Sequence, residues 1–284
     1  MRKATLFSGV VCALVSVGLC IGESQADVSA KLSRGTLTLT GDGFGDVVEM
    51  VGIGPNQIEF SVNGETPVVY GEVQNIKIDM KKGADALCIN QITISGNLDV
   101  NLGGDLGDVS ATFGCLVNGN VTFKGCSDSV MFDCRVGKNL TVEAGLPLDS
   151  LDFQRAHGGD DGDDGEGDDG GDDGGDDGGN GGNGNSCIPY GEDGFTMLVA
   201  NCIVTGKATL KGSAQSVDSV CVIENFVAND LTVNLGGGAD VLAIDANFIG
   251  KNLNMDGGKG SDLVDSALNV VAGMTKLKNF EFVF

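Results

Sequence analysis

Short runs of alternating apolar and polar residues fill most of the chain and recur at a nearly constant spacing. Seven six-residue pieces have Asn, Cys or Ile in the first place, Val or Ile in the third, and a turn at the end. A second alternating run, such as Leu-Thr-Val, follows each of them. Alternation with a period of two predicts β-strands with one buried face. The pieces begin at residues 92, 115, 134, 202, 225, 247 and 269, so five of the six spacings are 19 to 23 residues.

A repeat of this length predicts a solenoid, because each short unit can bury its apolar face only against its neighbours. With about 22 residues per coil and no helical stripe, we expect an all-β fold, namely a right-handed parallel β-helix of eight or nine coils. Equivalent strands would pair about 4.8 Å apart along the axis. We expect left-handed φ at the Gly and Asn corner residues, and hydrogen bonds along stacked Asn side chains. These corner residues are Gly96, Asn97, Gly119, Asn120, Asn139, Gly250 and Asn252.

Residues 27–79 depart from the repeat and are predicted to form an N-terminal β cap. Asn63-Gly64 lies between two alternating runs and indicates a hairpin. The terminal unit of a solenoid must cover an open end and an unpaired strand edge, so it is expected to be atypical. The β-helix would then occupy residues 80–284, interrupted at 156–190.

The cap carries a family resemblance. The stretch GTLTLTG at 35–41 is followed by Gly45-Asp46-Val47 and then by the Asn-Gly hairpin. Over roughly residues 35–110 the chain resembles the opening of a broad group of bacterial exported β-solenoid proteins. The resemblance implies a β-solenoid fold and export.

Residues 1–26 have the form of a signal peptide. Arg2 and Lys3 precede an apolar run at 4–22, and Ser24-Gln25-Ala26 offers small residues at a cleavage site. We expect cleavage after Ala26; the alternative is an uncleaved anchor helix, since the run could nearly span a bilayer. No second run of this length follows, so the mature chain is expected to be exported without a membrane span. Its location would be extracellular, periplasmic or at the cell surface.

The chain is strongly acidic. Loss of Arg2, Lys3 and Glu23 with the leader would change the net charge from −23 to −24. Phosphate contacts need a basic face, so nucleic acid is not an expected partner, whereas divalent cations are. Residues 158–185 contain only Gly, Asp, Glu and Asn, a composition that cannot form a core and predicts a disordered loop. That loop either gathers cations weakly or is a solvated expansion without a specific role.

One Asp per repeat precedes an alternating strand. Carboxylates stacked about 5 Å apart repel each other unless something compensates. Either each Asp accepts hydrogen bonds from turn N–H groups, or cations lie between the coils with Asp and carbonyl oxygens as ligands. The row comprises Asp85, Asp108, Asp128, Asp149, Asp218, Asp240 and Asp262.

Glycines precede three of these aspartates in a recognisable pattern. The pieces LGGGAD at 235–240, GGKGSD at 257–262 and GGDLGD at 103–108 resemble the calcium turns of repeats-in-toxin proteins. The resemblance implies Ca²⁺ as a cofactor, although that family uses nine-residue copies in tandem and this chain has one copy in about 22. The residues it implicates are Gly236, Gly238, Asp240, Gly258, Gly260, Asp262 and, by partial match, Asp108.

Seven cysteines remain after removal of the leader, an odd number. Cys115, Cys134 and Cys202 share one repeat position. Neighbouring coils bring such residues within disulfide reach, but a column of buried thiols is the alternative.

These features favour a non-catalytic structural or interaction protein that acts outside the cell. Its partner would be a surface polymer or another surface protein, and calcium would stabilise it if the Asp turns bind that ion. The competing hypothesis is a carbohydrate-active β-helix enzyme, which rests on analogy of fold alone. Paired carboxylates with a basic residue in a groove would favour the enzyme. Stacked Asp corners on a smooth rod would favour the scaffold.

Overall fold

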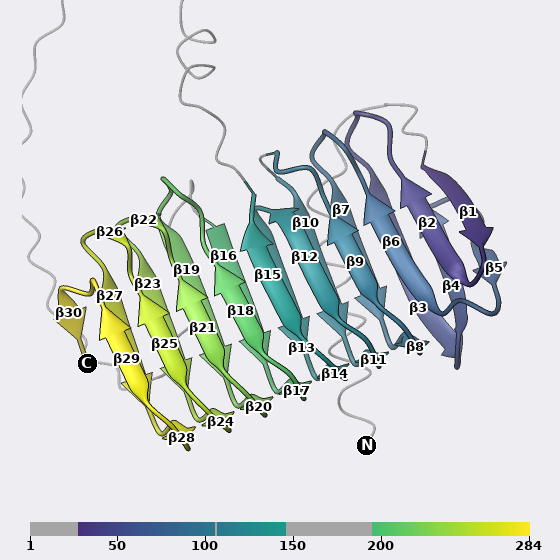
Figure 1. Cartoon of the computed structure of the whole chain (residues 1–284). Helices are drawn as coiled ribbons and strands as arrows, with labels where there is room; N and C mark the ends of the chain where they lie inside the picture. Colours follow the sequence, from purple (N-terminus) through teal and green to yellow (C-terminus); the bar gives the residue numbers. More distant parts are fainter. Residues whose placement is uncertain (1–27, 106, 146–194) are drawn as a thin grey trace, which may run out of the picture. The chain divides into compact units, whose positions relative to one another are not determined.

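The computed structural model describes residues 28–105, 107–145 and 195–284, and all of them belong to one compact unit. This part of the chain is all-β and forms a parallel β-helix (Figure 1). The predicted leader, Asp149 and the acidic stretch at 158–185 lie outside the described residues.

Three long sheets form the walls of the β-helix. Sheet A has ten strands: β1 Ser29–Ser33, β2 Thr36–Thr40, β6 Asn75–Asp79, β9 Leu98–Asn101, β12 Val121–Cys126, β15 Leu140–Ala144, β18 Ala208–Lys211, β21 Leu231–Asn234, β25 Leu253–Asp256 and β29 Thr275–Lys278.

Sheet B has eleven strands: β3 Val47–Gly54, β4 Gln57–Val62, β5 Val68–Tyr70, β7 Ala86–Asn90, β10 Val109–Phe113, β13 Asp128–Phe132, β16 Phe195–Ala200, β19 Asp218–Ile223, β23 Val241–Asp245, β27 Leu263–Ala267 and β30 Phe282–Val283. Sheet C has seven two-residue strands: β8 Thr93–Ile94, β11 Leu116–Val117, β14 Arg135–Val136, β17 Ile203–Val204, β20 Phe226–Val227, β24 Phe248–Ile249 and β28 Val270–Val271. A fourth, small sheet pairs β22 Gly237–Gly238 with β26 Lys259–Gly260.

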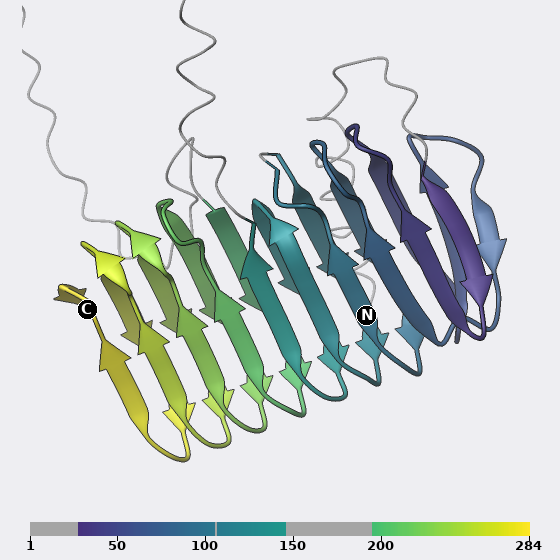
Figure 2. The same cartoon turned by 45° about the horizontal axis from the view of Figure 1, so that its top comes forward.

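Each complete coil contributes one strand to each of the three walls, which the view in Figure 2 shows. The described residues contain seven such coils, from β7–β9 to β27–β29, so the expectation of eight or nine was too high. One reason lies at the insertion. Strand β13 pairs directly with β16 across a sequence separation of 68 residues, which leaves no room between them for a strand from the Asp149 region.

The core fills the space between the walls. From β2 to β25 every second residue along the strands of sheet A points inward, starting at the first or second position, and the leading pair in each strand consists of Leu, Val, Ile, Phe, Ala or Met. Strand β9 shows the pattern, with Leu98 and Val100 buried and Asp99 and Asn101 exposed. Burial of these stacked side chains is the main favourable term that holds the coils together.

The first strands close the N-terminal end of the β-helix. Strands β2, β3 and β6 pair in parallel with the coils, whereas β1, β4 and β5 pair antiparallel and cover the edges. The predicted hairpin is present, because Asn63 and Gly64 both have positive φ and join β4 to β5. A second turn at Pro55-Asn56, between β3 and β4, was not expected.

Residues with left-handed φ lie at the corner between sheets B and C, and not at the predicted Gly/Asn corner between sheets C and A. The seven Gly and Asn corner residues fall outside the positive-φ region. Glycine is needed there for close approach instead: a Cβ on Gly119 would lie 2.4 Å from the carbonyl oxygen of Gly96 in the preceding coil. The left-handed residues precede the Asn/Cys position of the repeat, and they are Gln91, Gly114, Asp133, Asn201, Glu224, Ala246 and Leu268.

Candidate functional site

The predicted aspartates form two hydrogen-bonded ladders at the turn that leads into sheet B. In the first, the backbone N–H of Asp46 donates to Oδ1 of Asp85 at 2.8 Å, and that of Asp85 donates to Oδ1 of Asp108 at 2.9 Å. All three carboxyl groups are fully buried. The carboxyl groups of Asp85 and Asp108 therefore each connect one coil to the preceding coil.

The second ladder has the same geometry three coils further along the chain. The N–H of Asp218 donates to Oδ1 of Asp240 at 2.8 Å, and the N–H of Asp240 donates to Oδ1 of Asp262 at 3.0 Å. Glu281 completes it, because its Oε2 accepts from the N–H of Asp262 at 2.7 Å. The structure thus joins Asp240 and Asp262, as predicted, and leaves Asp108 in the separate first ladder.

The predicted row contains one wrong member and lacks two others. Asp128 is the register partner of Val109 rather than of Asp108, so Ser127 occupies the ladder position in that coil. Equivalent residues of these two coils are 19 positions apart, whereas Asp108 and Asp128 are 20 apart, so Asp128 lies one residue beyond the ladder position. Asp46 and Glu281 were missed; the pattern Gly-Asp-Val at 45–47, repeated at 107–109, is the signal that could have identified Asp46.

The glycines of the predicted calcium turns allow adjacent turns to stack closely. Gly236 and Gly258 have φ of +98° and +99°, and a Cβ on Gly258 would lie 2.0 Å from the carbonyl oxygen of Gly236. Gly238 and Gly260 are likewise left-handed, and each belongs to the small sheet formed by β22 and β26. The Gly pattern therefore serves backbone conformation and coil spacing.

Burial makes several of these carboxyl groups hard to ionise. Desolvation, assisted by neighbouring carboxylates, raises the pKa of Asp85 to about 8 and that of Asp240 to about 7. Burial raises the pKa of Asp108 only to about 6, because the N–H groups of Asp85, Gly104 and Asp105 donate to its carboxylate and stabilise the charge. The neutral acid is therefore the favoured form at Asp85 at neutral pH.

One oxygen of each of three buried carboxyl groups remains without a hydrogen bond in the described part of the chain. These atoms are Oδ2 of Asp85, Asp240 and Asp262. Hard oxygen donors of this kind suit Ca²⁺, and the turn carbonyls supply further donors of the same class. Within residues 28–105, 107–145 and 195–284, however, no three His, Cys, Asp or Glu side chains are grouped as a metal site would require. The ladder of backbone hydrogen bonds accounts for the stacked aspartates without a cation.

A second column connects the coils at the corner between sheets B and C. Its members are Ile92, Cys115, Cys134, Cys202, Asn225, Asn247 and Asn269, the set that the repeat alignment placed together. In its Asn half, Asn225 Nδ2 donates to Asn247 Oδ1 at 3.0 Å and to the carbonyl of Val199 at 2.8 Å. Each member, from Ile92 to Asn269, is directly preceded by one of the left-handed residues named above.

The Cys half of this column consists of free, buried thiols, so the alternative of a buried thiol column is confirmed over a Cys115–Cys134 disulfide. Cys115, Cys134 and Cys202 each direct Sγ to the carbonyl two residues earlier, at 3.2, 3.3 and 3.2 Å. A hydrogen bond with Cys115 and burial raise the pKa of Cys134 well above its usual range. Cys134 is therefore a structural thiol and a poor nucleophile.

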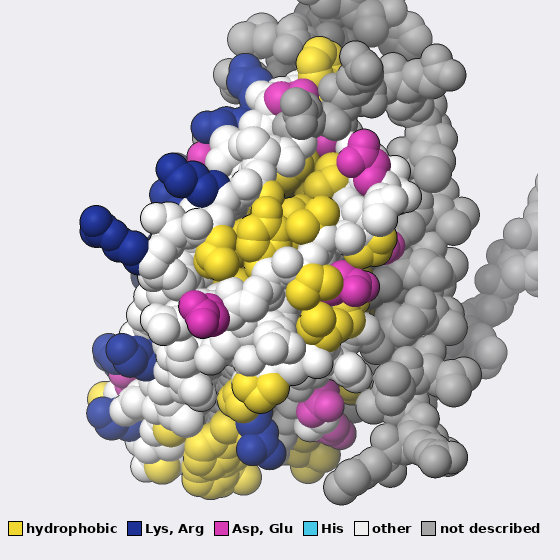
Figure 3. All heavy atoms as spheres, turned by 90° about the vertical axis from the view of Figure 1, so that its right-hand side faces the viewer, with side chains coloured by type: hydrophobic (Ala, Val, Ile, Leu, Met, Phe, Trp, Pro, Cys, Tyr) yellow, Lys and Arg dark blue, Asp and Glu magenta, His cyan; other side chains and the backbone are white. Residues whose placement is uncertain are grey.

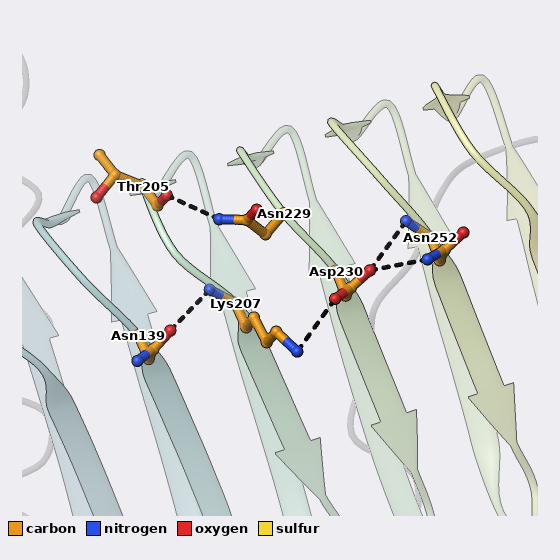
Figure 4. Close-up of polar contacts among 6 residues, drawn as sticks. All are labelled: Asn139, Thr205, Lys207, Asn229, Asp230 and Asn252. Atoms are coloured by element: carbon orange, nitrogen blue, oxygen red, sulfur yellow. Dashed lines mark hydrogen bonds and ion pairs between the residues drawn. The ribbon is translucent and has the colours of Figure 1, made fainter.

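A third ladder lies at the corner between sheets C and A, and Figure 4 shows its C-terminal part. Asn139 Oδ1 accepts from the N–H of Lys207 at 3.0 Å, and Asp230 Oδ1 accepts from the N–H of Asn252 at 3.3 Å. Between these coils the ladder positions are Lys207 and Asp230 rather than two Asn residues. Lys207 Nζ lies 3.3 Å from Asp230 Oδ2, so an ion pair links them. The predicted stacking of Asn side chains is confirmed here, since Asn139 Nδ2 donates to Asn120 Oδ1 at 3.1 Å.

The outward face of sheet A gathers polar and charged residues in rows. Four threonines occupy one row on adjacent coils: Thr122, Thr141, Thr209 and Thr232. In the next row Glu143 lies between two lysines, 3.1 Å from Lys124 Nζ and 2.6 Å from Lys211 Nζ. The face carries six lysines and four acidic residues, although the chain is strongly acidic. They are Lys31, Lys77, Lys124, Lys211, Lys276, Lys278, Asp79, Asp99, Glu143 and Asp256.

Comparison with known proteins adds no assignment. No protein-family model matches the chain, and neither a curated protein nor a solved structure matches it. Within the described ranges, none of the secondary structure is a helix of the length and hydrophobicity that crossing a bilayer requires.

Proposed function

We propose that the protein is exported and acts outside the cell as a non-catalytic β-helix that binds an acidic surface polymer through the outward face of sheet A. The fold provides long, regular walls, and the leader at residues 1–26 supports export. The stacked Asp corners are the feature that favours a scaffold over an enzyme.

The distribution of lysine carries this proposal. A chain with net charge −23 places six of its lysines on one sheet. Figure 3 looks onto the end formed by β1, β4 and β5 and shows basic side chains gathered along one edge. Equivalent side chains recur every 4.7–4.9 Å along such a wall. Repeated polar groups of this kind suit an extended chain that carries repeated charge, because each unit of the polymer meets a similar environment.

The test compares two sets of charge reversals in the purified mature chain. Lys31→Glu, Lys77→Glu and Lys276→Glu change sheet A at exposed positions for which the described residues show no ion pair. As the turn variant, Lys138→Glu and Lys251→Glu in the turns and Lys259→Glu in the short strand β26 make the same charge change at exposed positions. The probe is polygalacturonate immobilised on a sensor, with neutral dextran as reference.

The sheet A variant should bind roughly tenfold more weakly and the turn variant should be unaffected, with binding reduced by salt. Equal losses in both variants, or no binding by the unmodified chain, would refute the assignment of this face.

Export has its own test. The N-terminus of the protein recovered outside the cytoplasm should begin at Asp27. An intact N-terminus in the cytoplasmic fraction would contradict export, whatever the outcome of the binding experiment.

We further propose that Ca²⁺ can occupy the Asp240–Asp262 turn when both carboxyl groups are ionised. The support is the pair of buried Oδ2 atoms without hydrogen bonds. Because burial raises the pKa of Asp240 to about 7, a cation competes with a proton at this turn, and calcium should bind better at pH 8.5 than at pH 5.5.

The test is thermal unfolding with calcium or chelator at both pH values, in the wild type and in Asp240→Asn/Asp262→Asn. Calcium should raise the midpoint only in the wild type and more at the higher pH. An unchanged midpoint at pH 8.5 rules calcium out at this turn.

A further inference from the structure

The C-terminal end of the β-helix combines exposed apolar side chains with unpaired strand edges. Strands β28, β29 and β30 are the last strands of sheets C, A and B, and each pairs on one side only among the described residues. On β29, Leu277 continues the core column of Met255 and is 42% exposed. Met274, Val283 and Phe284 are all more than half exposed. A strand edge of this kind is a surface that another β-sheet can extend.

The N-terminal end has the same two features. In the part of the chain that the structure describes, β1 and β5 are the outermost strands of sheets A and B at this end. Ala30 and Leu32 of β1 pack against the core. Ile53, Val68 and Val69 are about half exposed, and Figure 3 shows apolar side chains gathered at the centre of this end. Exposed apolar patches of this kind mark sites of interaction.

The strand order in the sheets decides how two copies can meet. Each of the three walls runs from one end of the β-helix to the other. A second copy placed along the axis in the same direction brings every wall to the same wall of its neighbour, so that β29 meets β1 and β30 meets β5. Two C-terminal ends related by a two-fold axis match only one wall, because the other two walls exchange places. Pairing of β29 with itself would also bring Lys276 and Lys278 close to the same lysines of the other copy, which is unfavourable.

Side chains on the two edges of sheet A fit a contact in the same direction. Strand β1 runs antiparallel to β2, whereas the strands from β2 to β29 are parallel, so β29 would pair antiparallel with β1 of the next copy. The core side of β29 carries Leu277, and the core side of β1 carries Ala30 and Leu32. The apolar core would therefore continue across the contact, which repeats the stacking that joins neighbouring coils.

We propose that the mature chain assembles with further copies of itself, the C-terminal end of one β-helix against the N-terminal end of the next, so that its walls continue from copy to copy. Such a contact is heterologous and does not close, so it produces linear oligomers rather than dimers alone. The chain is strongly acidic, and salt should favour assembly because it screens the repulsion between copies. The inference does not rest on polymer binding by sheet A, which salt should weaken.

The test uses one variant for each end and measures mass by sedimentation velocity from micromolar to near-millimolar concentration. The N-end variant is Val68→Asp/Val69→Asp, and the C-end variant is Leu277→Asp/Phe284→Asp, all at exposed positions. The weight-average mass of the wild-type chain, residues 27–284, should rise at least twofold over this range. Each variant alone should stay monomeric. An equal mixture of the two should form a one-to-one dimer and nothing larger, because only one intact pair of ends remains.

The matched control is Leu116→Asp/Phe226→Asp, which places the same charges on sheet C at side chains that are 38% and 41% exposed. It should assemble like the wild type. Dimer formation in the mixture shows that both end variants are folded, and amide exchange in β1 and β29 of the wild type should slow as the concentration rises. A wild-type chain that is monomeric at every concentration, an N-end variant that dimerises alone, or an equal loss of assembly in the sheet C variant would each overturn the proposal.

Discussion

At the scale of the residue, the most informative groups are carboxyls placed where charge is unfavourable. An unfolded Asp titrates near pH 4, whereas burial raises the pKa of Asp240 to about 7 and that of Asp85 to about 8. Between these values the folded protein retains protons that the unfolded chain has released. The free energy of unfolding therefore falls as the pH rises from about 4 to about 8, by at most about 1.4 kcal/mol per pH unit for each such carboxyl.

The variant Asp240→Asn isolates one of these groups. Asn keeps an Oδ1 that can accept from the N–H of Asp218 but does not titrate. We expect its free energy of unfolding to be close to that of the wild type at pH 5, higher than that of the wild type at pH 8.5, and less dependent on pH between them. Urea unfolding from pH 5 to pH 9 measures this. The control is Asp265→Asn on the exposed side of β27, which should keep the wild-type slope. A slope identical in Asp240→Asn and wild type would show that Asp240 is ionised in the folded state.

At the scale of the element, one column uses two chemistries for the same task. Asn225 and Asn247 bond to the coils on both sides, Asn269 bonds to the preceding coil, and the three cysteines before them place a thiol at the same position. Cys202 Sγ lies 3.8 Å from the carbonyl of Met131, the counterpart of the 2.8 Å bond from Asn225 Nδ2 to Val199. The amide reaches its partners at full hydrogen-bond strength, and the thiol makes only weak contacts.

This difference predicts opposite outcomes for two exchanges. Asn247→Leu removes the acceptor of the Asn225 N–H and the donor to the carbonyls of Val222 and Asp245. It should lower the free energy of unfolding by about 2 kcal/mol or more, the usual effect of unsatisfied buried polar groups. Cys202→Asn extends the Asn column by one coil and should change it by less than about 1 kcal/mol. Urea unfolding of both variants at pH 6 measures the contrast. A larger loss in Cys202→Asn would mean that the thiol half of the column cannot accommodate an amide.

The repeat pattern predicted these elements well because each coil faces the same physical problem. The pieces aligned from residue 92 to residue 269 are the registered column of sheet C, and the alternating Leu-Thr-Val runs are strands of sheet A. Two details were wrong for identifiable reasons. Asp128 was shifted by one because its coil is short, and the left-handed residues include Ala246 and Leu268, whose types give no hint of such a conformation. In the Asp ladders each carboxyl accepts from the N–H of the preceding coil. This direction depends on the backbone geometry of the turn, which the residue types alone do not show.

At the scale of the whole β-helix, the coils on either side of the insertion are joined as if it were absent. Strands β13 and β16 pair over five residues, β14 and β15 pair with β17 and β18, and Asn139 bonds to the N–H of Lys207. Because residues 158–185 offer no apolar side chain for packing, we expect the insertion to affect stability mainly through the entropy of closing the loop.

Deletion of residues 158–185 tests this. The segment between β15 and β16 would shorten from 50 to 22 residues, which changes the closure term by less than about 1 kcal/mol in favour of folding. We expect the thermal midpoint of the deletion variant to be equal to or a few degrees above that of the wild type. As a control, replacement of the same 28 residues by a Gly-Ser chain of equal length should leave the midpoint unchanged at high salt. A marked fall in both variants would show that the acidic stretch packs on the fold.

The two ends of the β-helix are built differently, and this sets a gradient of stability along it. At the N-terminal end, antiparallel β1 and the β4–β5 hairpin cover the edges of sheets A and B. At the other end, β28, β29 and β30 each pair on one side only, and large apolar residues such as Leu268, Met274 and Phe284 are exposed. In a solenoid, stability is close to a sum over neighbouring coils, so a coil with one neighbour opens more readily.

Amide hydrogen exchange should therefore be asymmetric along the chain. We expect slow exchange in β16–β21, nearly as slow exchange in β2 and β6 behind the cap, and exchange at least tenfold faster in β27–β29, because the last coil can separate without disturbing the others. Exchange followed by mass spectrometry of peptides from each coil at pH 6 measures this. Removal of residues 27–33, which deletes β1, should then speed exchange in β2 and β6 while leaving β16–β21 unchanged. Uniform protection from β2 to β29 would mean that all coils open in one cooperative step. The contacts at the two ends would then contribute equally to stability, although the ends are built differently.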